Sequence, residues 1–315
     1  AKHGVRFENA LDESDFGRDP NVIIILADDL GYGDCEPFNS SSKIKTPYLS
    51  KLAEEGLCFT DAHAASATCT PSRYGLLTGI SPVRTGVRNT LLSEGKPIIE
   101  KQEQTLADLF QKKGYHTHMV GKWHLGFDWD RKWTNQPLRG GPVDRGFDTF
   151  FGIHSSAGGE PLCFLEQDRL VGRPTEDINF PKYNSKGEKV INHAKAASGF
   201  TIEGTSEAFI QRTVHLLKEH STNKNQKPFF LYYASPIPPQ PWVPMKKFRG
   251  KSGLGDYGDF VMQLDWVVGE INQAPKKYDL DQNTLLIFTS DNGAGPPAHK
   301  VMSDQGHASS EIYRG

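Results

Sequence analysis

Four short runs of apolar residues divide the chain. They are Val22–Leu26, the region around His118–Val120, Phe229–Tyr233 and Leu285–Phe288. A strand that helices cover on both faces needs a nearly continuous apolar run, because neither face meets water. The pattern therefore predicts four strands buried in a parallel sheet.

Between these runs, three segments place apolar residues at helical spacing: Thr46–Gly56, Thr105–Gly114 and Tyr257–Ile271. Pro47 stands at the expected first helical position of the first segment, and a glycine ends each of the first two. The residues expected to face the core are Leu49, Leu52 and Ala53 in the first segment, Leu106, Leu109 and Phe110 in the second, and Phe260, Leu264, Val267, Val268 and Ile271 in the third. Strands that alternate with helices predict a doubly wound α/β fold.

Charged and amide side chains follow three of the four predicted strands. They are Asp28 and Asp29, then Lys122 and His124, and finally Asp291 and Asn292. Ligands bind at the carboxyl ends of the strands in open parallel sheets, so we expect a functional site at this edge. The more polar stretch from about Gly152 to Ser221 is expected to form loops and short helices over that site.

The composition fits a soluble globular protein with one large α/β domain or two modest ones. The 315 residues are 37% hydrophobic and 23% charged, with a formal net charge of −2. That balance gives no general attraction to nucleic acid or to an anionic membrane. No run approaches the ~18 apolar residues of a membrane helix. Ala1–Pro20 carries no signal-peptide core, and four cysteines are too few for a disulfide scaffold.

Asp28, Asp29, Asp291 and Asn292 offer oxygen ligands from the ends of two strands. Three carboxylates brought together repel one another unless a cation lies among them. Oxygen-only ligands favour Ca²⁺ or Mg²⁺ over zinc. Two interpretations stand at this point: a divalent-metal site, or solvated turns at the two strand ends.

Lys122 and His124 are two positions apart, which puts both side chains on one side of an extended chain. Together they could hold an anion, and the histidine could also move protons. The alternative is a surface lysine and a structural histidine beside Trp123.

Cys69 opens the segment Cys69-Thr70-Pro71-Ser72-Arg73. If a helix begins here, Arg73 lies one turn further on the same face. A helix N-terminus and a nearby guanidinium would then lower the pKa of the thiol. The residues alone leave both a reactive cysteine and a buried structural cysteine open.

Two other patterns carry no function. Gly250–Ser252 looks like the end of a phosphate-binding loop, but Met245 stands where a glycine is required. His116, His118 and His124 alternate with bulky apolar residues and have no cysteine partner at zinc-finger spacing.

The Cys69 segment, followed by Leu77-Thr78-Gly79, resembles the signature of the type I sulfatases, Cys-x-Pro-x-Arg with a later Leu-Thr-Gly. Residues 28–34 match that family's Asp-Asp-x-Gly-x-Gly-Asp, and residues 121–126 match its Gly-Lys-Trp-His-Leu-Gly in full. Asp291-Asn292-Gly293 follows a late strand, as in the family. These motifs keep the family's order across nearly the whole chain.

The resemblance implies an alkaline-phosphatase-like α/β sandwich, whose mostly parallel central sheet is flanked by helices. It also implies an arylsulfatase-like hydrolase that depends on formylglycine. In the family this group is made from the signature cysteine, here Cys69. One hydroxyl of the hydrated aldehyde attacks sulfur, the alcohol leaves, and the other hydroxyl helps to expel sulfate.

The same resemblance implies a role for each motif residue. A divalent cation, usually Ca²⁺ and otherwise Mg²⁺, would be bound by Asp28, Asp29, Cys69, Asp291 and Asn292. Arg73 would hold the formylglycine. Lys122 would contact the sulfate, His124 would contact the nucleophile, and Ser156 stands where a family hydroxyl sometimes reaches the sulfate.

The chain departs from the family pattern in two places. Pro239 occupies the position of a histidine that donates to the sulfate or to the leaving oxygen, and proline cannot donate. Gln240 beside it could donate a hydrogen bond but cannot act as an acid. The sequence also stops at Tyr313-Arg314-Gly315, just before a Gly-x-Lys-Gly element. Residues 1–315 are therefore expected to be the larger catalytic part, without the family's small C-terminal domain.

We expect a sulfatase that acts on a sulfated carbohydrate. The alternatives are a phosphate or phosphonate ester hydrolase on the same scaffold, and a non-catalytic relative that binds sulfated glycans. The expected partners are the substrate and a maturation enzyme, either formylglycine-generating or anaerobic, with no nucleic acid and no membrane span. By resemblance the protein is exported to the periplasm, the extracellular space or the lysosome. Arg145, Arg169 and Arg173 are candidate contacts for a polyanionic chain, unless they are simply solvated.

Overall fold

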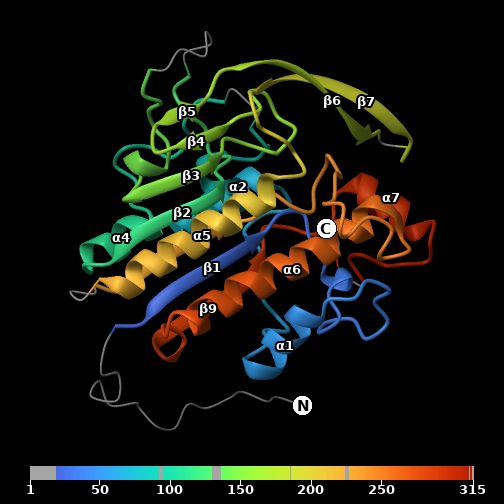
Figure 1. Ribbon diagram of the computed structural model, residues 1–315, viewed down its shortest axis with the longest axis horizontal. Helices are drawn as coiled ribbons and strands as arrows, with labels where there is room; N and C mark the ends of the chain where they lie inside the picture. Colours follow the sequence, from blue (N-terminus) through green and yellow to red (C-terminus); the bar gives the residue numbers. More distant parts are fainter. Residues whose placement is uncertain are drawn as a thin grey trace.

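Figure 1 shows a computed structural model, which describes residues 19–91, 95–129, 136–184, 186–223, 227–311 and 313. The predictions for Ala1–Pro20 and for the end at Arg314 and Gly315 fall mostly outside these ranges. None of the described helices combines the length and the apolar character that crossing a membrane requires.

A seven-stranded sheet forms the centre of the structure, in the order β5-β4-β3-β2-β8-β1-β9. Its strands are β1 (Asn21–Ala27), β2 (His116–Lys122), β3 (Thr149–Ile153), β4 (Phe164–Glu166), β5 (Arg169–Val171), β8 (Phe229–Ala234) and β9 (Thr284–Ser290). The five strands from β3 to β9 in this order are parallel, whereas β4 and β5 are antiparallel additions at one edge. The mostly parallel sheet predicted from the four apolar runs is confirmed.

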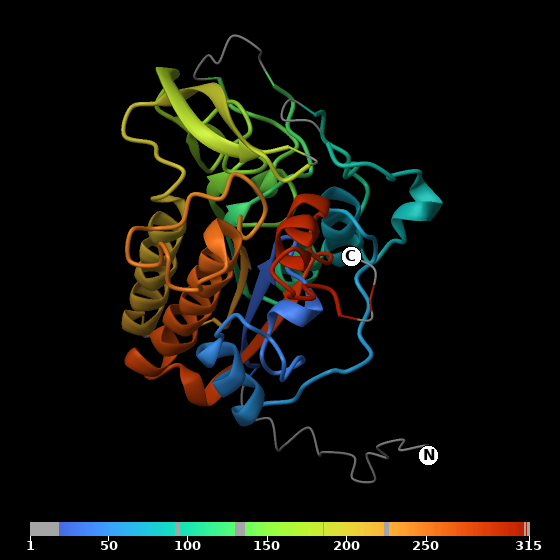
Figure 2. The same cartoon turned by 90° about the vertical axis from the view of Figure 1, so that its right-hand side faces the viewer.

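Helices cover both faces of the sheet, as the view in Figure 2 shows. They are α1 (Pro47–Glu55), α2 (Cys69–Thr78), α3 (Pro82–Thr85), α4 (Leu106–Lys112), α5 (Thr205–Thr222), α6 (Gly255–Lys277) and α7 (Pro296–Ser303), with short 3₁₀ turns at Tyr32–Asp34, Pro142–Asp144 and Asp281–Asn283. Successive residues of β1 point to opposite faces. Ile23 and Ile25 join the core under α5 and α6, which cross one face in Figure 1, while Ile24 packs in a second core with α2 and α4.

A long two-stranded hairpin lies apart from the central sheet. It consists of β6 (Pro174–Tyr183) and β7 (Lys189–Ala197), and it arches over the upper right of the molecule in Figure 1. The prediction of loops and short helices for Gly152–Ser221 was therefore wrong. This stretch holds the hairpin, the short strands β4 and β5 and most of the 18-residue helix α5. The hairpin strands carry many exposed polar residues, so their sequence lacks the apolar runs of the central strands.

Two smaller predictions also need correction. Leu109 is 49% exposed, and Ala107 is the residue of α4 that is fully buried. β9 is parallel as predicted, but it lies at the free edge of the sheet, so Leu285 remains 51% exposed and Ile287 40% exposed.

Candidate active site

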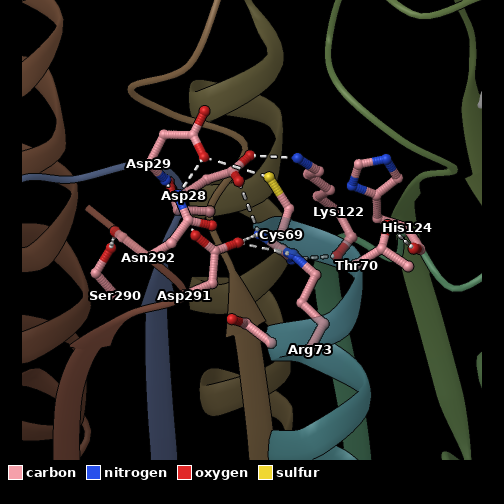
Figure 3. A network of polar contacts seen from close by, with 12 residues as sticks. Asp28, Asp29, Cys69, Thr70, Arg73, Lys122, His124, Ser290, Asp291 and Asn292 are labelled. Carbon is pink, nitrogen blue, oxygen red and sulfur yellow. Dashed lines mark hydrogen bonds and ion pairs between the residues drawn. The ribbon is translucent and has the colours of Figure 1, made fainter. Parts of the chain in front are cut away.

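The carboxyl ends of β1 and β9 bring the predicted acidic residues together. The two strands pair in parallel with Ala27 opposite Ser290, so Asp28 and Asp291 leave the sheet side by side. The Asp291 N–H donates to the Ala27 carbonyl at 3.1 Å. Figure 3 shows the resulting cluster, with Cys69 and Arg73 of α2 and Lys122 of β2 together on one side of the acidic residues.

Asp28, Asp29, Cys69 and Asp291 each place one possible ligand atom within 4.8 Å of the others. Asn292 belongs to the same cluster, because its Nδ2 donates to Asp29 Oδ1 at 2.6 Å. The Oδ1 of Asn292 is buried, and it has no hydrogen-bond partner among the described residues. An orphaned buried oxygen among three carboxylates fits a divalent cation better than it fits solvated turns.

The charges in the cluster do not balance. Burial together with Asp28 raises the pKa of Asp29, and the same two causes hold the pKa of Asp291 well above its usual value. Asp28 is the exception, because Lys122 and Arg73 outweigh its burial and lower its pKa. Two cationic side chains thus face three carboxylates, and this excess negative charge would be neutralised by a bound cation.

Arg73 lies one turn after Cys69 on α2, as predicted, and is completely buried. Its Nε and Nη2 contact Asp291 Oδ2 at 3.0 and 2.9 Å, while Nη2 lies 3.3 Å from Asp28 Oδ1. Nη1 donates to the Lys122 carbonyl at 2.9 Å. The guanidinium therefore joins α2 to the ends of all three strands that carry the motifs.

Cys69 is the first residue of α2, and its Sγ donates to Asp29 Oδ1 at 3.3 Å. The expectation of a lowered thiol pKa was wrong. Burial and the neighbouring Asp28 raise the pKa of this thiol, and Lys122 does not compensate for them. A thiol that stays protonated is a poor nucleophile.

Lys122 reaches the cluster, and Figure 3 shows the His124 imidazole beyond it, on the Lys122 side. Lys122 ends β2 and places Nζ 2.6 Å from Asp28 Oδ2. His124 has a left-handed backbone with φ of 60°. Its imidazole is buried, and burial together with Lys122 lowers its pKa well below the usual range. At neutral pH the ring is therefore uncharged.

Two other predicted contacts, Ser156 and Arg145, are not supported by a contact in the structure. Ser156 is only partly buried, and its carbonyl accepts from the Gly159 N–H at 3.0 Å. The neighbouring Ser155, which was not predicted, is 4% exposed, and its hydroxyl has no partner in the described part of the chain. Arg145 cannot meet a polyanion as suggested, because it is buried and donates twice to the Ile99 carbonyl.

Gln240 does not replace the missing histidine. Its side chain accepts from the Tyr183 N–H and donates to the Tyr183 carbonyl at 3.0 Å. Both ends of the amide are therefore occupied by the β6–β7 hairpin. Pro239 beside it is partly buried and has no proton to donate.

Sequence reasoning missed the residues that hold the cluster in place. Ser290 accepts from the Leu30 N–H at 3.2 Å and donates to the Asn292 carbonyl at 2.7 Å. The loop after β1 also packs tightly, because a side chain at Gly31 would come within 2.0 Å of the Ser309 carbonyl oxygen. Asp34, the last residue of the first motif, also fixes this loop, because its Oδ2 accepts from the Gly31 N–H at 3.1 Å. The acid at the end of the motif is the sequence signal that could have revealed this role.

Comparisons with known proteins identify the family of this chain. A family model described as Sulfatase matches residues 20–314. This chain belongs to the sulfatase family. It is 36% identical over 332 residues to the N-acetylgalactosamine-6-O-sulfatase of Bacteroides thetaiotaomicron, a match that covers 94% of this chain and 64% of the relative. Human arylsulfatase A is 34% identical over 282 residues, covering 88% of this chain and 52% of the relative.

A solved structure gives the same fold. It comes from work on the metabolism of multiple glycosaminoglycans by Bacteroides thetaiotaomicron, and it superposes on this sulfatase with a TM-score of 0.82 at 33% identity. The superposition covers 95% of this chain and 68% of the other. The predicted alkaline-phosphatase-like sandwich is therefore confirmed. The sulfatase chain spans about half to two thirds of the length of the curated relatives that it matches.

Proposed function

We propose that this sulfatase hydrolyses sulfate monoesters of a sulfated carbohydrate, with a formylglycine made from Cys69 as the nucleophile. The observation that carries the proposal is the buried cluster in which Cys69 lies among three carboxylates, Lys122 and Arg73. Membership of the family supports the reaction class. The names of the relatives, which include an N-acetylgalactosamine-6-O-sulfatase, support a carbohydrate substrate.

Ca²⁺ is the cation that the donor set fits best, with Mg²⁺ as the alternative. Asp28, Asp29, Asp291 and Asn292 would hold it through oxygen atoms, together with the oxygen that formylglycine places where the Cys69 sulfur now stands. When bound, the cation would stabilise negative charge on the nucleophile and on a sulfate oxygen.

Four side chains would have separate roles in the reaction. Lys122 would contact the sulfate, since its ammonium group has three donors and the single carboxylate contact to Asp28 leaves others for an anion. Arg73, already fixed by Asp28 and Asp291, would hold the formylglycine in place. His124 would accept the proton of the hydroxyl group that reforms the aldehyde as sulfate leaves. Ser156 would be a further contact for the sulfate.

A formylglycine nucleophile requires a partner. We propose that an enzyme of the formylglycine-generating or anaerobic maturing class converts Cys69 before α2 is buried, because the folded structure leaves the cysteine only 9% exposed. We also propose that the protein is exported, as members of this family generally are.

The unaltered protein and one variant, Cys69→Ala, test the proposal. Protein coexpressed with a formylglycine-generating enzyme should release sulfate from 6-sulfated N-acetylgalactosamine or another sulfated sugar in a panel, and from 4-nitrophenyl sulfate. Cys69→Ala should release none. Mass spectrometry of the peptide that contains residue 69 gives the fraction of Cys69 converted to formylglycine, so that lack of conversion is not mistaken for lack of activity. Faster turnover of 4-nitrophenyl phosphate would favour the phosphatase alternative, and no turnover of any ester by converted protein would favour a binding role.

A further inference from the structure

Thr70, the residue after Cys69, forms a closed cycle of hydrogen bonds with His124 and Leu91. Its hydroxyl donates to the His124 carbonyl at 3.1 Å and accepts from the Leu91 N–H at 3.0 Å. The His124 ring closes the cycle, because Nε2 lies 3.2 Å from the Leu91 carbonyl oxygen. Thr70 is completely buried, so water does not replace these contacts.

The contact with the Leu91 carbonyl decides which nitrogen of the His124 imidazole carries a hydrogen. A carbonyl oxygen can only accept, so Nε2 must be the donor to Leu91. In the neutral imidazole the other nitrogen, Nδ1, then has a lone pair and no hydrogen. The opposite tautomer would set the Nε2 lone pair against the carbonyl lone pairs of Leu91.

Nδ1 is left free for a reacting group. It is buried, and no described residue forms a hydrogen bond with it. In Figure 3 the imidazole stands on the Lys122 side of the cluster, with one ring nitrogen turned toward it. A buried nitrogen with an unused lone pair is what a proton acceptor requires.

The backbone of His124 is fixed from both sides as well. Its N–H donates to the His154 carbonyl at 2.8 Å, and its own carbonyl accepts from Thr70. These bonds hold a left-handed φ of 60°, which is costly for a residue other than glycine. Loss of the Thr70 hydroxyl would remove one of the two backbone anchors and loosen the loop at Leu91.

We propose that Thr70 is a positioning residue for His124: through Leu91 it keeps the imidazole as the Nε2–H tautomer and presents Nδ1 as the proton acceptor. The inference rests on the proposed function, because it assigns a task to the histidine of that site. It adds a role for the second residue of the Cys-Thr-Pro-Ser-Arg segment, which otherwise only separates Cys69 from Pro71.

The chain offers a matched control in Thr117. This threonine is also completely buried, its hydroxyl donates to the Gly146 carbonyl at 2.7 Å, and it accepts from the Asp148 N–H at 2.9 Å. Thr117→Val therefore removes the same pair of bonds from a loop at the opposite end of β2. Thr70→Ser keeps the hydroxyl, whereas Thr70→Val removes it at nearly constant shape.

The first measurement is the imidazole ¹⁵N spectrum of histidine-labelled protein at pH 7, with the His124 signals assigned from His124→Gln. Wild type, Thr70→Ser and Thr117→Val should show one Nε2–H tautomer at His124, and Thr70→Val should show a mixture. A wild-type His124 that is protonated on Nδ1, or a Thr70→Val spectrum like that of wild type, would overturn the proposal. This measurement does not depend on turnover, so its failure is distinct from failure of the proposed function.

The second measurement is turnover of 4-nitrophenyl sulfate, divided by the converted fraction of residue 69 because Thr70 adjoins the modified cysteine. Thr70→Val should lower kcat by about tenfold or more with KM changed by less than about twofold, since only the proton transfer is impaired. Thr70→Ser should stay within about threefold of wild type. An equal loss in Thr117→Val, or no rescue by serine, would show that Thr70 is merely structural.

Discussion

His307 donates from Nε2 to Asp34 Oδ1 at 2.8 Å, across 273 positions of sequence. The other oxygen of this carboxylate accepts from the Gly31 N–H at 3.1 Å and from the Tyr257 hydroxyl. All of these polar side chains are buried. Because Asp34 ends the loop that begins with Asp28, one carboxylate ties the loop of candidate metal ligands to α6 and to the segment after α7.

Asp34→Asn is expected to weaken Ca²⁺ binding by about tenfold or more, as loss of a group supporting metal ligands usually does. The asparagine side chain has the same shape as aspartate, but one of its two acceptor oxygens is replaced by an NH₂ group. That group would face an N–H or O–H donor, and two donors cannot form a hydrogen bond with each other. Titration calorimetry with Ca²⁺ measures the change. Asp265→Asn is the matched control, since Asp265 is also buried and accepts from the Tyr48 and Leu49 N–H groups at the start of α1. An equal loss of affinity in both variants would mean that Asp34 matters only for stability.

Adding Ca²⁺ should stabilise the folded protein. The cation would neutralise carboxylates that now repel one another, and a ligand at a hundred times its Kd adds about 2.7 kcal/mol to the free energy of unfolding. Thermal unfolding in EGTA and in excess Ca²⁺ measures the shift in Tm. Asp29→Asn should remove most of this shift, whereas Asp177→Asn should keep it, because Asp177 forms an exposed ion pair with Lys195. A shift that Asp29→Asn leaves unchanged would place the cation elsewhere.

Much of the site could be predicted from the sequence, because the strands that carry it are continuous apolar runs and their polar ends meet by topology. Asp28 and Asp291 illustrate this, since their strands pair in parallel with matched ends. The direction of the Cys69 pKa shift was predicted wrongly. Burial and the carboxylate of Asp28, which comes from a distant segment, raise this pKa, whereas the Cys69 segment itself shows only Arg73. The hydrogen bonds of Thr70 with Leu91 and of Gln240 with Tyr183 could not be predicted. Both are made to backbone groups, which every residue carries, so the sequence gives no sign of them.

His118 should make the protein less stable in mild acid. It lies in β2 with Nδ1 2.7 Å from Thr149 Oγ1, and burial, reinforced by His116, lowers its pKa from 6.5 to about 4. Between these values the unfolded chain binds more protons than the folded one, so stability present at pH 7 is lost as pH falls. The full effect is about 3 kcal/mol, with about 2 kcal/mol lost by pH 5.

Urea unfolding of wild type and His118→Gln at pH 7 and pH 5 measures this effect as the difference in pH dependence between the two proteins. His63→Gln is the control, because His63 is a highly exposed histidine on a surface loop. If wild type and His118→Gln lose the same free energy between the two pH values, His118 is not the group responsible.

Pro239→His should raise turnover if the family's proton donor is what this loop lacks. The described residues of the loop offer no substitute, because both ends of the Gln240 amide are bound to Tyr183. General acid catalysis contributes about 10²-fold or more, so kcat for an ester with a poor leaving group should rise by a large part of that factor. For 4-nitrophenyl sulfate, whose leaving group needs little protonation, the gain should be small.

Pro239→Asn separates proton donation from the loss of a rigid proline. Asparagine frees the backbone in the same way and can donate a hydrogen bond, but it has no titratable proton. With both variants fully converted at residue 69, only Pro239→His should gain rate, and its kcat should fall at high pH as the new imidazolium loses its proton. An equal gain in Pro239→Asn would assign the effect to loop freedom. No gain in either would mean that another group protonates the leaving oxygen, or that water does.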